Sequence, residues 1–265
     1  MNMLRERVLI TVKTYPNPSH KYEETVCTAG LALGLNQFVR LYPVRFRDLP
    51  YDQWFKKWDI VEADIQLRTA DARGDTYTPL GETLPVVGHI GTGPGRPPDW
   101  AERNEIILPH VSTVEELVAR SEERKGSLGL VRAEACAELK VEADEPDWTP
   151  EQAAILDQQH LFGGRRRRLE KIPHKFYYQF KCHSGCDGHK FMVLDWEIYE
   201  LYRSQATKKG SAAAVEDVLQ RYNGALSPLT HDIHFFVGTS IKYQAQFSIV
   251  GVYYPPRRPD GVKEA

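Results

Sequence analysis

The spacing of apolar residues predicts strands through the first part of the chain. Arg7–Tyr15 is a continuous run rich in Val, Ile and Thr, which is typical of a buried strand. Phe38–Val44 and Ile60–Arg68 alternate between apolar and polar residues, which predicts two strands with unlike faces. Residues 70–100 are rich in Gly, Pro and Asp and predict an irregular or weakly stranded segment. Leu128–Val141 predicts one or two more strands.

Helices are predicted later in the chain by capping residues ahead of apolar stripes. Four starts are expected, at Ser112, Thr149, Asp195 and Ser211. Ser112 and Glu115 have the spacing of a capping box, and so do Thr149 and Gln152. The remaining strands are expected at Lys175–Cys182, Phe191–Leu194, Asp232–Val237 and Phe247–Tyr254.

The order of these elements decides the expected fold class. Strands and helices do not alternate regularly, which favours α+β over a doubly wound sheet. We expect a strand-rich, barrel-like N-terminal domain at residues 1–145 and an α+β domain with mixed strands and helices at 146–256. Residues 257–265 are expected to form a mobile tail.

Composition narrows the class of protein. The net charge of −2 does not direct the chain to nucleic acid or to a membrane, so such binding would need a local patch. Four cysteines in 265 residues are too few for a disulfide framework. No apolar run approaches the roughly 18 residues of a membrane span, and the N-terminus does not have the pattern of a signal peptide. A cytoplasmic protein with no membrane partner is therefore expected.

The loop at residues 182–189 is the most specific signal in the sequence. It holds Cys182, Cys186 and His189, whose sulfur and nitrogen atoms are the ligands that zinc prefers. Gly185 and Gly188 allow the chain to fold back tightly. We predict a zinc site, with a structural role favoured over a catalytic one, against the alternative that these residues meet by chance near a turn.

The fourth zinc ligand stays open at this point. His183 is one candidate, although two adjacent residues rarely reach one ion when one lies on a strand. The others are Cys27, Cys136, His160, His174, His231, His234 and water. A bound water would leave the site open for catalysis.

Two carboxylates follow the loop. Asp195 and Glu197 could orient a ligand or act as a general base. We favour the plainer interpretation, in which Asp195 caps a helix and Glu197 interacts with the helix dipole.

A basic stretch precedes the loop. Its cations are Arg165, Arg166, Arg167, Arg168, Lys171, Lys175 and Lys181. With Glu170 as the one acidic residue, the local charge is 7 − 1 = +6. Tyr177 lies on the strand face that carries Lys175 and Lys181, and cations with aromatic rings between them suit single-stranded nucleic acid. Arg40 belongs to a smaller basic cluster. The alternative is a solvated loop followed by an ordinary amphipathic strand.

The turn at Thr14–Gly30, between two expected core strands, is dense in polar groups. Ser19, Lys21, Tyr22 and Glu24 could form a ligand-binding loop. Cys27 is interpreted as a small buried residue rather than a nucleophile. The chain has no GxxxxGK[ST] motif and no GxGxxG after a strand, which argues against ATPases, GTPases and NAD enzymes.

Four motifs resemble an uncharacterised family found in bacteria and phages. They are VKTYP…S.KY.ETVCTAG in Val12–Gly30, VRLYPV.FR in Val39–Arg47, IP.KF.Y.FKC…C.GH…DWEI in Ile172–Ile198, and FF.GT…I.GV.YPP in Phe235–Pro256. The resemblance covers most of the chain but implies no settled activity. In the family His183 is often another residue. The CTAG…VRLYPV portion is also similar to proteins with paired OB-like barrels, although Phe38 stands where those have Trp. OB-like barrels commonly bind nucleic acid.

These signals together predict a nucleic-acid-associated binding protein with a structural zinc site and a preference for single-stranded DNA or RNA. The alternative is a metal-dependent hydrolase or nuclease that uses the same Cys/Cys/His site, with Asp195, Glu197 or His234 as the base. A third hypothesis is a small-molecule binding protein that uses Ser19–Thr25. Whether the chain is an enzyme, and its oligomeric state, stay open.

Overall fold

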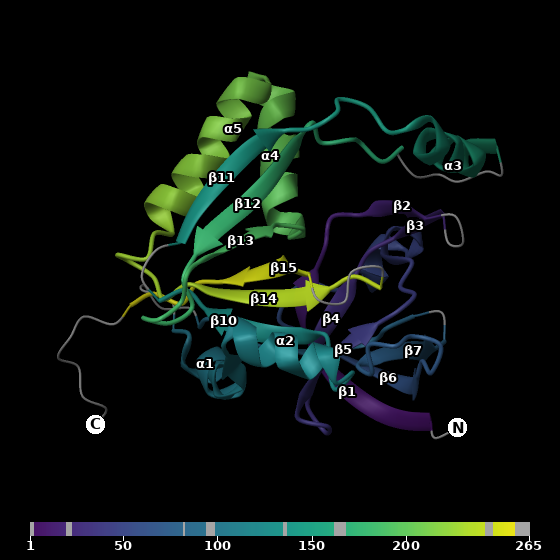
Figure 1. Ribbon diagram of the computed structural model, residues 1–265. Coiled ribbons are helices and arrows are strands. Elements are labelled where there is room, and N and C mark those ends of the chain that lie inside the picture. The colour runs from purple at the N-terminus through teal and green to yellow at the C-terminus, as the bar shows by residue number, and fades with distance from the viewer. Residues whose placement is uncertain are drawn as a thin grey trace.

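The computed structural model is shown in Figure 1. It describes residues 3–19, 23–81, 83–93, 99–134, 137–161, 168–241 and 246–257, with only the backbone described at 19, 23–25 and 158–161.

The N-terminal half is a closed barrel of five strands. They are β1 (Met3–Lys13), β4 (Thr28–Ala32), β5 (Gln37–Leu41), β7 (Thr76–Leu80) and β6 (Asp59–Leu67), in that order around the barrel. The barrel closes because β6 pairs with both β7 and β1. The β5–β7 pair is parallel and the other pairs are antiparallel. Alternate residues such as Val61, Ala63 and Ile65 fill the interior. The predicted strand-rich, barrel-like half is confirmed.

The segment at 70–100 is more regular than predicted. It contributes β7 to the barrel and β8 (Val86–His89), which adds to β6. β7 was hidden in the sequence because Pro79 and a nearby glycine interrupt its apolar pattern. A short hairpin of β2 (Asn17–Ser19) and β3 (Glu23–Thr25) lies between β1 and β4.

A second sheet covers the outside of the barrel. Its order is β15 (Phe247–Tyr253), β14 (His234–Thr239), β10 (Leu128–Arg132) and β9 (Val111–Ser112). Leu9 and Leu31 of the barrel share one apolar cluster with Leu130 and Phe236 of this sheet. Because both of its faces are covered, every residue of β4 is buried.

A third sheet and two helices complete the C-terminal half (Figure 1). The sheet is β11 (Ala137–Ala143), β12 (His174–Phe180) and β13 (His189–Met192), and α4 (Trp196–Lys209) and α5 (Ser211–Leu219) pack beside it. Phe176, Tyr178 and Phe180 point into this core, as the alternation of β12 predicts. Tyr178 packs on Phe235 of the second sheet, with their ring centroids 4.6 Å apart, so the two sheets share a core.

Three further helices are α1 (Ala101–Ile107), α2 (Val114–Glu122) and α3 (Pro150–Leu161). The predicted α2 capping box was wrong by one residue. Thr113 caps the helix: its hydroxyl accepts from the Glu116 N–H at 3.2 Å, and its own N–H donates to the Glu116 carboxylate at 2.9 Å. Ser112 lies in β9, and Glu115 is left free of the capping box.

Of the three other predicted helix caps, two are confirmed and one is wrong. Thr149 and Gln152 form the expected reciprocal pair ahead of α3. Asp195 caps α4 as predicted, because its carboxylate accepts from the Glu197 N–H at 2.7 Å. The cap of α5 is Gly210 rather than Ser211, whose hydroxyl instead contacts that of Tyr202 at 2.8 Å.

The predicted domain boundary near residue 145 lies within the C-terminal sheets. β10 precedes that boundary and pairs with β14, which follows it. Of the expected tail, Arg257 is described and donates to the carbonyl of His231, and residues 258–265 lie outside the described part of the chain. None of the described helices is long and apolar enough to cross a membrane.

Candidate metal centre

The turn that joins β12 to β13 brings the predicted trio together. The Nε2 atom of His189 lies 3.3 Å from the sulfur of Cys182 and 3.1 Å from that of Cys186. Gly188 has a φ of 109°, a left-handed conformation that favours glycine, and its N–H donates to the Cys186 sulfur at 3.3 Å. All three side chains therefore point to one centre.

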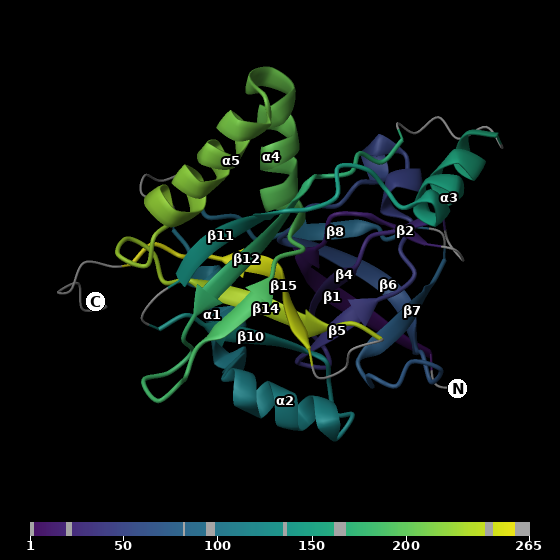
Figure 2. The same cartoon turned by 45° about the horizontal axis from the view of Figure 1, so that its top comes forward.

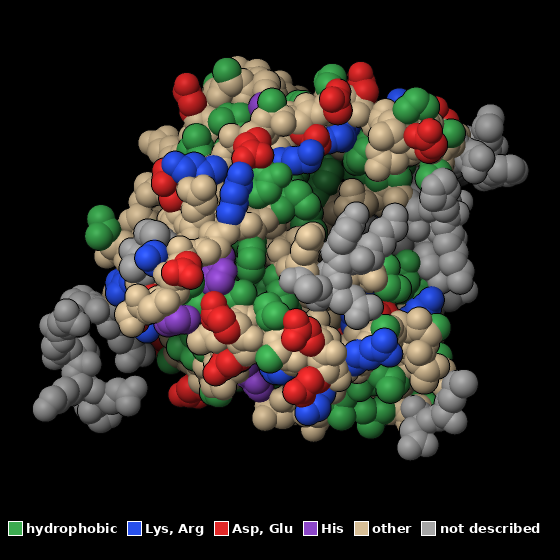
Figure 3. Space-filling model, viewed as in Figure 1, with side chains coloured by type: hydrophobic (Ala, Val, Ile, Leu, Met, Phe, Trp, Pro, Cys, Tyr) green, Lys and Arg blue, Asp and Glu red, His purple; other side chains and the backbone are tan. Residues whose placement is uncertain are grey.

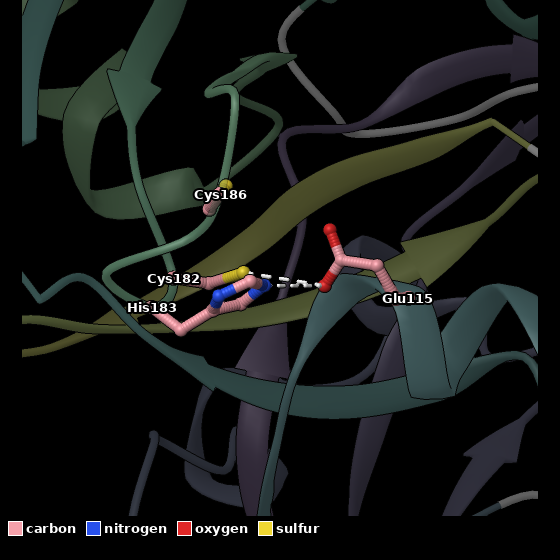
Figure 4. A group of neighbouring side chains, drawn as sticks. All are labelled: Glu115, Cys182, His183 and Cys186. Atoms are coloured by element: carbon pink, nitrogen blue, oxygen red, sulfur yellow. Dashed lines mark hydrogen bonds and ion pairs between the residues drawn. The ribbon is translucent and has the colours of Figure 1, made fainter.

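A carboxylate from α2 reaches the same centre. Glu115 lies in the first turn of α2, and Figure 2 shows the β12–β13 turn extending toward this helix. Its carboxylate is 3.6 Å from the Cys182 sulfur and 3.5 Å from His189 Nε2. Figure 4 shows Glu115 facing Cys182 and His183 across the gap. The sequence did not predict Glu115 as a ligand, because Glu115 and Cys182 lie 67 positions apart in the chain.

The distances suit a tetrahedral ion. Ligands at roughly 2.0–2.3 Å from zinc are separated from one another by about 3.3–3.8 Å. The contacts of His189 and Glu115 with the sulfurs span 3.1–3.6 Å. His183 is a fifth donor, with Nε2 at 3.4 Å from Glu115 and its ligand atom within 4.8 Å of both sulfurs. Glu115, Cys182, His183 and Cys186 are a group of four whose ligand atoms all lie within 4.8 Å of one another, and His189 adds shorter contacts to both sulfurs and a contact to the Glu115 carboxylate.

The electrostatic surroundings suit a cation bound by thiolates. The N–H of Val114, at the start of α2, donates to the Cys182 sulfur. Burial, together with Cys186 and Glu115, raises the pKa of the Cys182 thiol to about 12, so a cation is needed to hold the thiolate at neutral pH. Burial lowers the pKa of His189, which keeps the imidazole neutral and able to coordinate.

The other predicted candidates for the fourth ligand have partners elsewhere. His174 bonds to the Ser211 hydroxyl, His231 to the Thr230 hydroxyl, and His234 to the carbonyl of Asp232. Cys27 lines a cavity at the barrel rim. Cys136 and the side chain of His160 lie outside the described residues.

The carboxylates proposed as a general base are engaged in the structure. Asp195 is 1% exposed and accepts from the Lys57 ammonium at 2.6 Å and from the Val252 N–H at 3.0 Å, besides capping α4. Glu197 also pairs with Lys57, at 3.2 Å. Their contacts support the plainer interpretation, in which both residues stabilise the fold.

The described part of the basic stretch is largely paired with acidic residues. Lys171 and Lys175 both contact the carboxylate of Asp144, and Arg168 lies 3.2 Å from Asp157. The ring of Tyr177 is covered by Lys190, whose ammonium is 4.6 Å from the ring centroid. Arg165, Arg166 and Arg167 lie outside the described residues, and Lys181 is exposed. Figure 3 shows positive and negative side chains interspersed over this sheet.

The two remaining predicted groups are placed differently. The side chains of Ser19, Lys21, Tyr22 and Glu24 lie outside those described. Arg40 is not on an exposed surface, since it is only 2% exposed. It is buried because its outward-facing position on β5 is covered by the second sheet, and its guanidinium donates to the Ser127 hydroxyl at 2.9 Å and to the Thr239 carbonyl at 3.2 Å.

Arg40 forms part of a feature that the sequence did not reveal, which we call the arginine cavity. It is about 360 Å³ in volume and lies between the rim of the barrel and the ends of β14 and β15. Its charged lining is Arg40, Arg68, Arg73 and Asp71. Arg73 donates to both oxygens of Asp71, and it shares the Thr239 carbonyl with Arg40.

The fourth metal ligand can be assigned by mutation. We expect Glu115→Gln to lower metal affinity at least about tenfold. Mutation of residues that only hydrogen-bond to a metal ligand already lowers the affinity by about that factor. His183→Ala should leave the affinity within a factor of about three. Competition with a chromophoric chelator measures both, with Glu122→Gln on the same helix as the control. A larger loss in His183→Ala than in Glu115→Gln would assign His183 instead.

The fold and this centre define the class of protein: a mixed α+β chain with a closed five-stranded barrel and a Cys/His/Glu group that could hold a metal ion. A family model described as a domain of unknown function (DUF8757) matches residues 110–264, and a second (DUF8758) matches residues 4–109. The chain therefore belongs to the DUF8757 family, with a DUF8758 domain before it. A search of the curated proteins found no match.

Proposed function

We propose that this protein binds single-stranded nucleic acid and that its metal centre is a structural zinc site. The observation that carries the proposal is the position of the arginine cavity at the barrel rim. The two connections that bind ligands in OB-like barrels border this cavity here, and they bring arginines with them.

The barrel supports the comparison with OB-like folds by its topology. Numbered along the barrel, its strands run in the order 1-2-3-5-4 and close back on 1. OB-like barrels bind oligonucleotides through the loops that join strands 1 and 2 and strands 4 and 5. The equivalent connections here are residues 14–27 and 68–75. Thr14 and Cys27 line the cavity from the first, and Arg68 and Arg73 line it from the second.

The second sheet directs binding to this rim. OB-like barrels also use the outer face of strands 2 and 3, which correspond to β4 and β5. In this protein β4 is buried along its whole length, and Phe38 of β5 packs on Phe236 with ring centroids 5.8 Å apart. A strand of nucleic acid would therefore meet the connections rather than the face.

The donor set supports zinc in a structural role. Two cysteine sulfurs and an imidazole are soft to borderline ligands, which suit zinc better than magnesium or calcium. A carboxylate supplies the fourth donor within 3.6 Å. Four protein ligands leave no position for the water that the alternative, a metal-dependent hydrolase, would need.

Fluorescence anisotropy with a labelled single-stranded oligonucleotide tests the binding function. We expect binding that weakens steeply with salt, because phosphate contacts release counterions. Arg68→Ala should weaken it about tenfold. A variant with Arg165–Arg168 changed to alanine tests whether the basic stretch contributes as well. Absence of binding by the unaltered protein at low salt would refute the proposal.

A further inference from the structure

The arginine cavity has features that a groove for an internal stretch of nucleic acid would not need. Building on the proposed function, we infer that the cavity holds the phosphorylated end of a strand, so that its ligand group is a terminal phosphomonoester. The inference depends on three properties: unsatisfied buried donors, an excess of positive charge, and a closed rear wall.

The first property is hydrogen-bonding capacity left unused inside the cavity wall. The Nε of Arg40 and the hydroxyl of Thr239 are buried and have no hydrogen-bond partner within the described part of the chain. Both residues line the cavity, and they are 2% and 4% exposed. Buried donors are nearly always satisfied, because an unmade hydrogen bond is costly. Oxygen atoms of a bound phosphate would accept from both.

The second property is charge. Arg73 is neutralised by Asp71, and Arg40 lies 3.6 Å from Asp75, which is held from behind by Ser127. Three guanidinium groups therefore meet two carboxylates. Arg68 is the surplus cation, since among the described residues no carboxylate pairs with it. Its guanidinium lies 5.4 Å from the ring centroid of Tyr42.

The charge of the ligand discriminates between a strand end and a strand interior. A phosphomonoester carries about −1.5 to −2 charges at neutral pH, whereas an internal phosphodiester carries one. The phosphomonoester, which has the larger negative charge, therefore gains more binding free energy from the half-buried guanidinium of Arg68 than a phosphodiester does. Arginine is also suited geometrically, because its fork presents two donors to two phosphate oxygens.

The third property is the wall behind the buried donors. Thr239 at the end of β14 and Val250 of β15 are each 4% exposed and close the cavity on the side of the second sheet. Gly238 belongs to the same wall, and a Cβ there would lie 3.3 Å from an Arg40 nitrogen. With these residues behind Arg40, a phosphate bound there would have the rest of its strand leave on the opposite side. That is the geometry of a terminus.

The cavity also offers a place for the nucleoside beside the phosphate. Tyr42, Leu194 and Ile241 add apolar surface to the lining. A volume of about 360 Å³ lies near the lower limit for small-molecule sites, which suits one nucleotide rather than several. The ring of Tyr42, beside the Arg68 guanidinium, adds an aromatic surface to this lining, and base stacking on such a ring tolerates any base.

The test compares three forms of one labelled single-stranded oligonucleotide: with a 5′-phosphate, with a 3′-phosphate, and with hydroxyl groups at both ends. We expect one phosphorylated form to bind at least about tenfold more tightly than the unphosphorylated form. Whichever end is preferred identifies the polarity of the bound strand. A nucleoside monophosphate should compete for the site, and inorganic phosphate should compete more weakly.

Variants connect this preference to the cavity. Arg68→Ala, at a half-buried side chain that forms no ion pair with any described residue, should abolish the preference for a phosphorylated end. Arg40→Lys keeps the charge but removes the Nε donor, and it should also reduce the preference if it folds. Arg221→Ala, at an exposed arginine outside the cavity, is the matched control and should bind as the unaltered protein does.

Two outcomes separate this inference from the proposed function. Equal affinity for all three oligonucleotides would overturn the terminal-phosphate inference and leave nucleic-acid binding intact. Binding of the monophosphate without binding of any oligonucleotide would overturn the proposed function while supporting a phosphate site in the cavity. A preference that survives Arg68→Ala would also count against the cavity as its source.

Discussion

Cys186→Ser is expected to remove the metal and to lower the free energy of unfolding by about 4 kcal/mol, when free zinc exceeds its dissociation constant roughly a thousandfold. The physical reason is that the ion binds the folded chain and not the unfolded one. It also joins the β12–β13 turn to α2 through Cys182 and Glu115. Metal analysis and urea denaturation measure the two effects.

Two controls isolate the metal from the side chain. Cys27→Ser removes a free cysteine remote from the centre and should keep the metal. A chelator should lower the Tm of the unaltered protein to that of Cys186→Ser and should not change the Tm of the variant. Full metal content in Cys186→Ser, or equal stability with and without chelator, would contradict a structural zinc site.

Asp195→Ala is expected to lower the free energy of unfolding by about 3 kcal/mol, since breaking a buried pair leaves an uncompensated charge. Burial alone would lower the pKa of Lys57, but the carboxylates of Asp195 and Glu197 outweigh it and raise that pKa. Removing Asp195 takes away the larger of these two raising interactions, which lowers the pKa of Lys57 and leaves its buried ammonium with only the half-exposed carboxylate of Glu197 among these two partners. The same change removes the α4 cap and the acceptor of the Val252 N–H.

Urea denaturation with two companion variants checks this result. Glu197→Gln should cost less than about 1 kcal/mol, because its side chain is 48% exposed and exposed pairs contribute little. Adding Lys57→Met to Asp195→Ala should recover part of the loss, since the buried charge is then gone. If Asp195→Ala is as stable as Glu197→Gln, the buried pair has no such role.

The sequence predicted those parts of the structure whose signals are local. The alternation of Phe176, Tyr178 and Phe180 predicted the buried face of β12, and Asp195 was identified as a helix cap. The cysteines and histidine of one short loop could be grouped because a turn of a few residues leaves them little freedom to separate.

What the sequence missed depends on contacts between distant segments. Ser112–Glu115 and Thr113–Glu116 fit the capping-box pattern equally well, and only the structure shows that the second pair is used. The first assignment gave Glu115 a local role and hid its contact with the metal loop.

Arg40 is a second example. Arg40 and Phe38 are two residues apart on β5 and therefore share one side of the strand, but no local pattern shows that β14 lies over that side. A basic residue at such a position is expected to be solvated. Its burial, and the cavity that it forms with Arg68 and Arg73, follow from the way the C-terminal sheet docks on the barrel.

The complete burial of β4 has a consequence for how this architecture can evolve. Leu9 and Leu31, from the region matched by one family model, pack in the same cluster as Leu130 and Phe236, from the region matched by the other. The two regions are thus separate as sequence families but share an apolar interior. Recombination could not transfer the barrel to a new neighbour unless that neighbour supplied a sheet of matching shape, which ties the inheritance of each region to that of the other.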